Sequence, residues 1–395
     1  MLGYLRNNGE KGIRNVLLVV YTVECSHHVA REIASEFKDK EVHVIGFGGC
    51  APNEYANNML KTLCTHANVG AVLFVSLGCE NLDISGISAA VKSSGRPVTT
   101  LTIQSTGGTL KTIDKGVAWV KEAYAAMQAV PRVELQLQEL IVGTICGGSD
   151  ATSGISANPA IGKAFDKLIA DGATAIFEET GELIGCEYIM AGRAASKALA
   201  EQLIQVVDKA DIYYKKMGHD SFSAGNATGG LSTIEEKSMG AYSKSGDAVI
   251  SGIIKPTERP PQPGLFLLDV VPDGEPLFGF PNINDNAEIA ELISCGAHII
   301  LFSTGRGSVV GSAISPVIKI CGNPKTFRML QEDMDVDAGK IISGEATLDE
   351  VGEEILDCIR NTANGEPTRS EALRHREFVL TYKQFDKQQP GCFPG

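Results

Sequence analysis

The segment AVLFVSLGCENLDISGISAAVKSS, residues 71–94, decides the fold class of this chain. Its first seven residues are apolar or small throughout, which is typical of a strand buried on both faces of a sheet. A glycine turn follows, and ISGISAAVKSS (84–94) then has the character of a helix. A buried strand that leads through a tight turn into a helix is the repeating unit of a parallel α/β sheet.

The same unit recurs on both sides of this segment. Upstream, strand-like runs at 15–22 and 42–47 precede helical stretches at 28–37 and 57–67. Downstream, a run at 98–103 precedes a helical stretch at 109–128. After a pause at 129–138 the pattern resumes, with strands predicted at 140–145, 174–180, 264–271, 297–304 and 317–322 and helices at 160–172, about 190–216, after Thr233 and from about 345.

We therefore predict an α/β fold of two Rossmann-like domains with mainly parallel sheets flanked by helices. The first domain spans 1–132, with a role in dimerisation, and the second spans 133–395 and carries catalysis. A chain of 395 residues with 43% hydrophobic residues is long enough to fill two such cores.

Charge and hydropathy exclude several classes of function. The net charge is −13 and the sequence pI is about 5.1, with no basic stripe, so nucleic acid is not expected as a partner. No apolar run reaches the roughly 18 residues that span a bilayer. The polar, glycine-rich start MLGYLRNNGEKG does not resemble a signal peptide, so we expect a cytoplasmic protein without a membrane partner.

Ten cysteines in such a chain favour metal binding or catalysis over disulfides, although no CxxC pair is present. Three of them end apolar runs inside glycine turns: Cys50 in VHVIGFGGC, Cys79 in AVLFVSLGCE and Cys146 in ELIVGTICGGSD. Open α/β sheets bind ligands beyond the carboxyl ends of their strands, so the three thiols are candidate ligands of one metal. Each could instead pack as a small buried hydrophobic side chain.

His27 and His28 follow Cys25 at the end of the first predicted strand. A metal role is conceivable there, but adjacent helical residues cannot both face one point. We therefore favour the interpretation that these histidines are not metal ligands.

Charged residues in the same turns are candidate catalytic groups. Glu179 ends the TAIFEET run, and Arg306 follows AHIILFST, where its guanidinium could bind a carboxylate in bidentate fashion. Glu236 and Lys237 follow the GNATGG turn. A carboxylate can serve as general base, and a lysine can assist departure of a hydroxyl. For Glu236 and Lys237, helix capping with Thr233 and surface ion pairing are equally good explanations.

Glycine-rich turns can bring backbone N–H groups close to an anion. None has the spacing of a dinucleotide fingerprint or of a P-loop, so recognition of a small acid is favoured over a nucleotide. The candidate substrate-binding residues in these turns are Asp150, Asn158, Asn226, Gly229, Gly230, Gly305 and Ser308.

Several segments together resemble the altronate/galactarate dehydratase family over almost the whole chain. They are GYLRNNGEKGIRN (3–15), LGCE (77–80), CGGSDATSGISANPAIG (146–162), GNATGGLSTIEEKSMG (225–240), STGRGSVVGS (303–312) and EDMDVDAG (332–339). The resemblance implies a hydro-lyase that removes water from a sugar acid and yields a 2-keto-3-deoxy acid.

The resemblance also implies a divalent metal, usually iron, as Fe²⁺ or as an iron–sulfur cluster, with another divalent metal left open. Thiolate ligands suit iron, and a metal could acidify the Cα–H and polarise the leaving hydroxyl. Single-chain members carry a small domain before the GYLRNNGEKGIRN segment. We therefore expect this chain to be the large subunit of a split enzyme, with a separate small subunit of the SAF type and self-association of the large subunit.

Two alternatives remain. HREFVLT (375–381), NPAIGKAFDKL (158–168) and GLSTIEEKS also resemble the (R)-sulfolactate sulfo-lyase branch, which releases bisulfite and pyruvate, whereas GFGGC and SLGCE favour the dehydratases. An alternative of another class is a non-catalytic protein that binds sugar acids. The density of cysteine, glutamate and arginine in the turns exceeds what binding alone requires, so we favour an enzyme.

Overall fold

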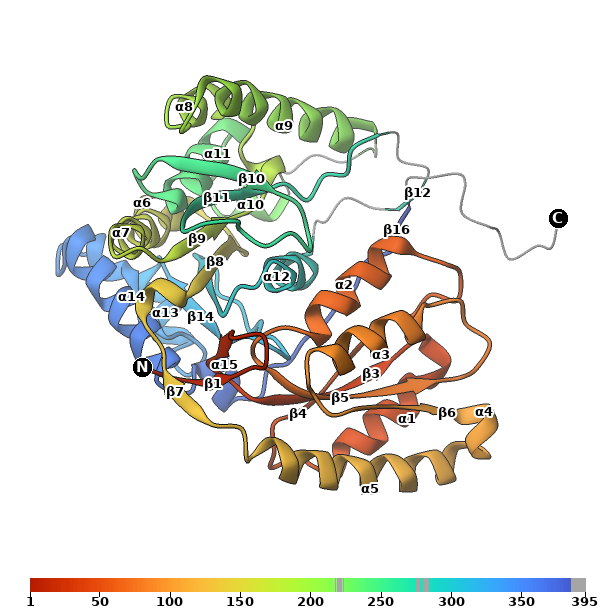
Figure 1. Cartoon of the computed structure of the whole chain (residues 1–395). Coiled ribbons are helices and arrows are strands. Elements are labelled where there is room, and N and C mark those ends of the chain that lie inside the picture. Colours follow the sequence, from red (N-terminus) through yellow and green to blue (C-terminus); the bar gives the residue numbers. More distant parts are fainter. Residues whose placement is uncertain (217, 219–221, 223, 275–277, 280–283, 385–395) are drawn as a thin grey trace. The chain divides into compact units, whose positions relative to one another are not determined.

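Figure 1 shows the computed structural model of the chain, which describes residues 1–216, 218, 222, 224–274, 278–279 and 284–384. The described residues fall into two compact units. The amino-terminal unit comprises residues 2–135 with the described parts of 273–280 and 376–384, and the carboxy-terminal unit comprises the described parts of 136–272 and 281–375. The predicted domains, 1–132 and 133–395, stay a proposal.

A four-stranded parallel sheet forms the centre of the amino-terminal unit, in the order β4-β3-β5-β6. Its strands are β3 (Val16–Tyr21), β4 (Val42–Gly46), β5 (Val69–Ser76) and β6 (Val98–Thr102). Helices α1 (Glu24–Ser35) and α5 (Thr109–Met127) cover one face, and α2 (Glu54–Cys64) and α3 (Ile84–Ser93) cover the other (Figure 1). All eight residues of β5 are buried, as its continuous apolar sequence predicts.

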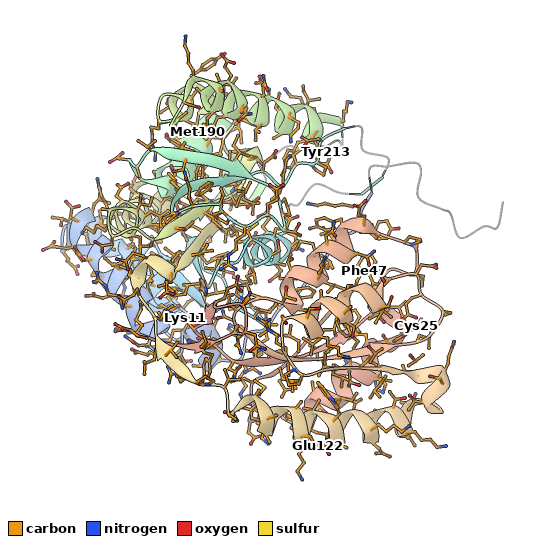
Figure 2. All side chains as sticks on the ribbon, in the orientation of Figure 1. Lys11, Cys25, Phe47, Glu122, Met190 and Tyr213 are labelled. Atoms are coloured by element: carbon orange, nitrogen blue, oxygen red, sulfur yellow. The ribbon has the colours of Figure 1, made fainter. Side chains whose placement is uncertain are left out.

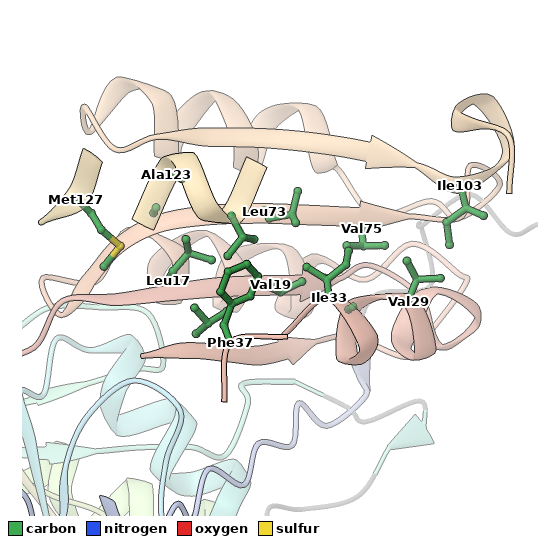
Figure 3. Packing of buried hydrophobic residues seen from close by; sticks show 14 residues of the cluster. Leu17, Val19, Val29, Ile33, Phe37, Leu73, Val75, Ile103, Ala123 and Met127 are labelled. Atoms are coloured by element: carbon green, nitrogen blue, oxygen red, sulfur yellow. The ribbon is translucent and has the colours of Figure 1, made fainter. Parts of the chain in front are cut away.

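The hydrophobic core between this sheet and the α1–α5 layer is shown in Figure 3. Val29 and Ile33 of α1 lie against Val19 and Val75 of the sheet, and Phe37 and Met127 complete the cluster. The unit also holds the short helix α4 (Ile103–Thr106), a small antiparallel sheet of β1 (Leu2–Leu5), β2 (Lys11–Gly12) and β7 (Arg132–Glu134), and the antiparallel pair β12 (Phe278–Gly279) and β16 (Lys383–Gln384).

The carboxy-terminal unit is built on a seven-stranded parallel sheet in the order β10-β11-β9-β8-β13-β14-β15. The strands are β8 (Ile141–Cys146), β9 (Thr174–Phe177), β10 (Ile250–Ile254), β11 (Gly264–Leu268), β13 (Ile299–Thr304), β14 (Val317–Cys321) and β15 (Val336–Asp337). Every residue of β8, β9, β11, β13 and β14 is buried. The central strands therefore read as apolar runs without alternation.

Helices α7 (Ala157–Ala170) and α14 (Leu348–Ala363) pack together beside this sheet, and α12 (Asp285–Ser294) contacts β8. Helix α14 begins with a capping box of Thr347 and Glu350, and Val351, Ile355 and Ile359 form its buried face at four-residue spacing. The remaining helices are α6 (Ala151–Ile155), α8 (Glu187–Ala191), α9 (Lys197–Lys216), α10 (Ala224–Thr228), α11 (Ile234–Tyr242), α13 (Pro324–Met329) and α15 (Arg369–Ala372), with the 3₁₀ turns η1 (Leu137–Glu139), η2 (Thr180–Glu182), η3 (Ser243–Ser245) and η4 (Ala338–Ile341).

The predicted α/β class with parallel sheets flanked by helices is confirmed. Helix α12 and strand β10 were not predicted. Among the described residues, no helix is both long enough and apolar enough to cross a bilayer.

Candidate active site

The carboxyl ends of β8 and β9 lie side by side and bring Cys146 next to two glutamates. The strands pair in parallel, so residues just beyond them share one edge of the sheet. The Cys146 sulfur lies 3.1 Å from Glu179 Oε1 and 3.3 Å from Glu182 Oε2, and the thiol can donate its one proton to either. The Cys146 backbone N–H donates to Glu179 Oε2 at 3.0 Å, and Ser149 Oγ donates to the sulfur at 3.3 Å.

Glu179 occupies a backbone conformation that a residue with a side chain rarely adopts. Its φ is 79° and its ψ is 50°, in the left-handed region. Such a conformation costs about 1–3 kcal/mol and persists only where the surroundings enforce it, often at functional sites. The turn it makes starts η2, and η2 brings Glu182 to within 3.3 Å of the Cys146 sulfur.

Two buried lysines neutralise these glutamates. Lys237 of α11 lies with its Nζ 2.5 Å from Glu182 Oε1, and it is 7% exposed. Lys244 of η3 forms an ion pair with Glu179, and it is 1% exposed. Two carboxyl groups and two ammonium groups therefore lie around one thiol, and we call this group the Cys146 cluster.

The two carboxyl groups of the Cys146 cluster are shifted in opposite directions. Burial, followed by the charge of Glu182, raises the pKa of Glu179 to about 8, although Lys244 opposes the shift. Burial would also raise the pKa of Glu182, but the charges of Lys237 and then Lys244 lower it. Desolvation, followed by the charges of Glu179 and Glu182, raises the pKa of the Cys146 thiol well above its usual range, so the thiol stays protonated at neutral pH.

Desolvation would lower the pKa of both lysines, but neighbouring acidic groups raise it, with Glu182 first at Lys237 and Cys146 followed by Glu179 and Glu182 at Lys244. Both ammonium groups are therefore charged at neutral pH, while Glu182 is ionised. A cluster that holds a base and a cationic acid of separated pKa is typical of proton-transfer sites.

A small polar pocket adjoins this cluster. Its volume is about 20 Å³, room for about one water molecule. It is lined by Cys146, Ser149, Asp150, Ser153, Gly154, Asn158, Glu182, Leu231, Glu236, Lys237, Gly240 and Ala241.

Asp150 lies at the centre of several predicted substrate-binding residues, but its carboxylate is already engaged. It caps α6 through the N–H groups of Thr152 at 2.9 Å and Ser153 at 3.0 Å, and Asn323 Nδ2 donates to it at 3.3 Å. The backbone at Gly229 and at Gly305 packs closely against the Asp150 side chain. A Cβ at Gly305 would lie 1.8 Å from Asp150 Oδ1, so the chain requires glycine at this close approach.

Other predicted residues hold elements together. Asn158 donates to the Gly240 carbonyl at 2.9 Å and accepts from Ser303 Oγ at 2.5 Å, which ties α7 to α11 and β13. Gly230 has a φ of 92° in the turn before α11. Asn226 is buried in α10, and Ser308 Oγ accepts from the N–H of Val310 at 3.3 Å.

Glu236 and Arg306, two predicted catalytic residues, lie nearer the surface than Lys237. The Glu236 carboxylate borders the pocket but accepts from the N–H and Oγ of Ser232, at 2.8 and 2.6 Å. Arg306 is exposed and donates to the Gly225 carbonyl at 2.9 Å. The expected capping box is only half formed, since Thr233 accepts from Glu236 N–H while Glu236 turns to Ser232.

Among the described residues, Cys146, Glu179 and Glu182 are the one group of three ligand atoms within 4.8 Å of one another that could hold a metal ion. A thiolate with two carboxylates is a reasonable donor set for iron. However, Lys237 is paired with Glu182 and Lys244 with Glu179, so a metal ion held by these carboxylates would lie beside two buried ammonium groups that repel it. The group therefore fits a metal poorly while the lysines remain, and we derive its chemistry from the side chains alone.

The two other predicted metal ligands, Cys50 and Cys79, lie in the amino-terminal unit and are exposed. A joint site of Cys50, Cys79 and Cys146 stays a proposal.

The sequence analysis did not identify Glu182 or Lys244. Both stand in short glycine-containing segments, GELIGC and SKSGD, that carry no recognisable motif. Their one signal is proximity in sequence to Glu179 and Lys237, which were candidates.

Comparison with known proteins gives matches along almost the whole chain. Residues 137–385 match the family described as D-galactarate/altronate dehydratase, C-terminal. Residues 3–128 match the D-galactarate dehydratase/altronate hydrolase second domain. The chain is 34% identical to the (2R)-sulfolactate sulfo-lyase subunit beta of Chromohalobacter salexigens, over 96% of both chains. It is 32% identical to the altronate dehydratase of Escherichia coli, over 95% of this chain and 76% of that protein, and 29% identical to the altronate dehydratase of Bacillus subtilis, over 96% and 76%.

Proposed function

This chain belongs to the D-galactarate/altronate dehydratase family, and we propose that it is a lyase that eliminates water from a sugar acid of the altronate or galactarate type. The reaction removes the proton from the carbon that bears the carboxylate and a hydroxyl. The hydroxyl of the next carbon leaves, and the enol formed collapses to a 2-keto-3-deoxy acid.

The Glu182–Lys237 ion pair at the pocket carries this proposal. Glu182 is ionised and can accept the proton of the Cα–H as general base. Lys237 is charged and can give a proton to the departing hydroxyl, so that water leaves rather than hydroxide. After one turnover Glu182 holds a proton and Lys237 lacks one. Their 2.5 Å contact lets that proton return directly, which restores both groups.

The second buried pair supports the first. Lys244 adds positive potential beside Glu182 and Glu179, and Cys146 lies between the two carboxylates. We assign positioning roles to Glu179, Lys244 and Cys146, because the Cys146 sulfur contacts both carboxyl groups and Lys244 pairs with Glu179. Iron, which the family resemblance implies, would supply Lewis acidity toward the substrate carboxylate and hydroxyl when bound.

A second candidate is elimination of bisulfite from (R)-sulfolactate to give pyruvate. The similarity to a sulfo-lyase subunit beta over 96% of both chains favours it. The two reactions share removal of the Cα–H and differ in the leaving group. Because that relative is named as a subunit, we also propose that this chain acts with a separate small subunit.

The deciding experiment is an anaerobic assay of the chain co-expressed with a candidate small subunit, with iron added. Altronate, galactarate and sulfolactate are offered separately, and keto acid and bisulfite are measured together. Keto acid from altronate or galactarate without bisulfite supports the dehydratase. Bisulfite release from sulfolactate alone establishes the second candidate instead, and no product from any of the three contradicts both.

A further inference from the structure

The exposed cysteines within the described part of the chain all follow strands at one edge of one sheet. Nine cysteines are described, and of these Cys25, Cys50 and Cys79 are exposed while the others are buried or half-buried. Free cysteines are usually buried, so three exposed thiols in one place require an explanation. Each follows a strand of the amino-terminal sheet: Cys25 follows β3, Cys50 follows β4 and Cys79 follows β5.

The order of the strands brings the three loops together. Strand β3 lies between β4 and β5, and Tyr21 at its end is level with Gly46 of β4 and Val75 of β5. The chain leaves β3 for β4 on one side and continues through β5 and β6 on the other, so the edge between β3 and β5 is the switch point where such sheets bind ligands. Figure 2 shows Cys25 at the end of the unit toward which the strand arrows of Figure 1 point.

Hydrogen bonds connect each loop to its neighbour. The N–H of Glu24, next to Cys25, donates to the Gly48 carbonyl at 3.2 Å. The Cys50 carbonyl accepts from the N–H of Asn81 at 3.1 Å, two residues beyond Cys79. The loop that carries Cys50 therefore contacts both the Cys25 turn and the Cys79 loop at this edge of the sheet.

Glu80 holds the Cys79 loop in a fixed shape. Its carboxylate accepts from the N–H groups of Gly78 at 2.8 Å and Cys79 at 3.0 Å, and from Thr22 Oγ1 at 2.5 Å. Partial burial opposes ionisation, but these hydrogen bonds lower the pKa of Glu80 to about 2. The loop is thus anchored to the end of β3, beside Cys25.

The histidines of the same edge have other partners. His27 stacks on Tyr21 at 4.4 Å between ring centroids, and its Nδ1 lies 3.1 Å from Glu24 Oε1. His28 lies 4.0 Å from Glu32. The thiols are therefore the better ligand candidates.

We propose that Cys25, Cys50 and Cys79 together bind an iron–sulfur cluster through three thiolates. Three cysteines would leave one iron of a four-iron cluster without a ligand from this unit. Each thiol releases one proton as it binds iron, and no electron transfer is needed for assembly from ferrous iron, ferric iron and sulfide. This inference rests on the proposed function only for the role of the iron–sulfur cluster. In the predicted set of metal ligands, Cys25 takes the place of Cys146, because the Cys146 thiol already contacts Glu179 and Glu182.

The test is anaerobic reconstitution of the full chain with iron salts and sulfide. Bound iron and sulfide are counted, and thiolate-to-iron charge-transfer absorption and the electron paramagnetic resonance signal are recorded. The variants are Cys25→Ser, Cys50→Ser and Cys79→Ser. Cys146→Ser and the half-buried Cys358→Ser are the controls, and circular dichroism checks that every variant is folded.

We expect at least a tenfold loss of bound sulfide and of the charge-transfer band in each of the three variants, with both controls like the wild type. A Cys25→Ser protein that binds the cluster normally overturns the proposal, as does a Cys146→Ser protein that cannot bind it. Wild-type protein that binds no sulfide also overturns it. A cluster that forms on these three cysteines in a chain without lyase activity supports this inference and contradicts the proposed function, so the two failures are distinguishable.

Discussion

Replacing Lys237 by methionine should destabilise the protein by about 3 kcal/mol at pH 7. Removal of one partner of a buried ion pair costs about 3–5 kcal/mol, because the other charge stays buried without compensation. Here the remaining charge is Glu182, which is 18% exposed and also lies near Lys244. Partial solvation and the second cation both reduce the cost, so we expect the lower end of the range.

The loss of stability should depend on pH in a defined direction. The charge of Lys237 is the leading reason that the pKa of Glu182 is lowered, so the ion pair stabilises the wild type above the unfolded pKa, about 4.3. This stability is lost as the pH falls through the lowered folded pKa. In Lys237→Met the pKa of Glu182 rises. The difference in the free energy of unfolding between the wild type and Lys237→Met is therefore largest at neutral pH. It shrinks as the pH falls, because Glu182 becomes protonated in both proteins.

Urea unfolding at neutral pH and near pH 4 measures this difference. The double variant Lys237→Met/Glu182→Gln should recover part of the loss, because it leaves no buried carboxylate unpaired. The matched control is Lys167→Met, which breaks an exposed ion pair with Glu353 of 2.7 Å and should cost less than about 1 kcal/mol. A deficit in Lys237→Met that does not change with pH, or single-variant losses that add fully in the double variant, would refute this account of the cluster.

Three further predictions follow from single contacts. Lys237→Met should lower the rate of water elimination by about 10²–10⁴-fold in a keto-acid assay, because hydroxide then leaves unprotonated. Gly305→Ala should cost about 2–4 kcal/mol in urea unfolding, because its Cβ would displace the Asp150 carboxylate and the α6 cap, whereas Gly192→Ala, with its nearest atom at 3.3 Å, should cost less. Thr347→Ala should cost about 1 kcal/mol in the same measurement, because α14 loses its capping box.

The buried parallel strands could be predicted because their signal is local. Each of β5, β8 and β13 is a continuous apolar run followed by a glycine turn, and both features stand within ten residues of sequence. Helix α12 gave no such signal. All its residues from Ala287 to Ser294 are buried, including Glu288 and Glu291, so it has no polar face for a helical period to reveal.

The site was predictable at the strand ends and not beyond them. Glu179 was a candidate because a charge after an apolar strand must lie at the edge of the sheet, and it lies in the Cys146 cluster. Lys244 pairs with Glu179 across 65 residues of sequence, and only tertiary packing specifies that pairing. Glu236 and Lys237 looked alike in sequence, but adjacent positions on a helix point in directions about 100° apart. Glu236 turns back to Ser232 before the helix, and Lys237 enters the cluster.

The Lys237–Glu182 pair also bears on which leaving group the site serves. Both candidate reactions need a base for the Cα–H, and Glu182 suits either one. They differ at the second bond, because hydroxide is a poor leaving group that requires a proton, whereas sulfite departs as a stable anion. A lysine held 2.5 Å from the base, charged and bordering the pocket, is therefore needed for water elimination and dispensable as an acid for bisulfite release. If Lys237→Met lowers the two activities equally, the lysine acts only through the ionisation of Glu182; if it lowers dehydration selectively, it is the acid, and the site is built for water.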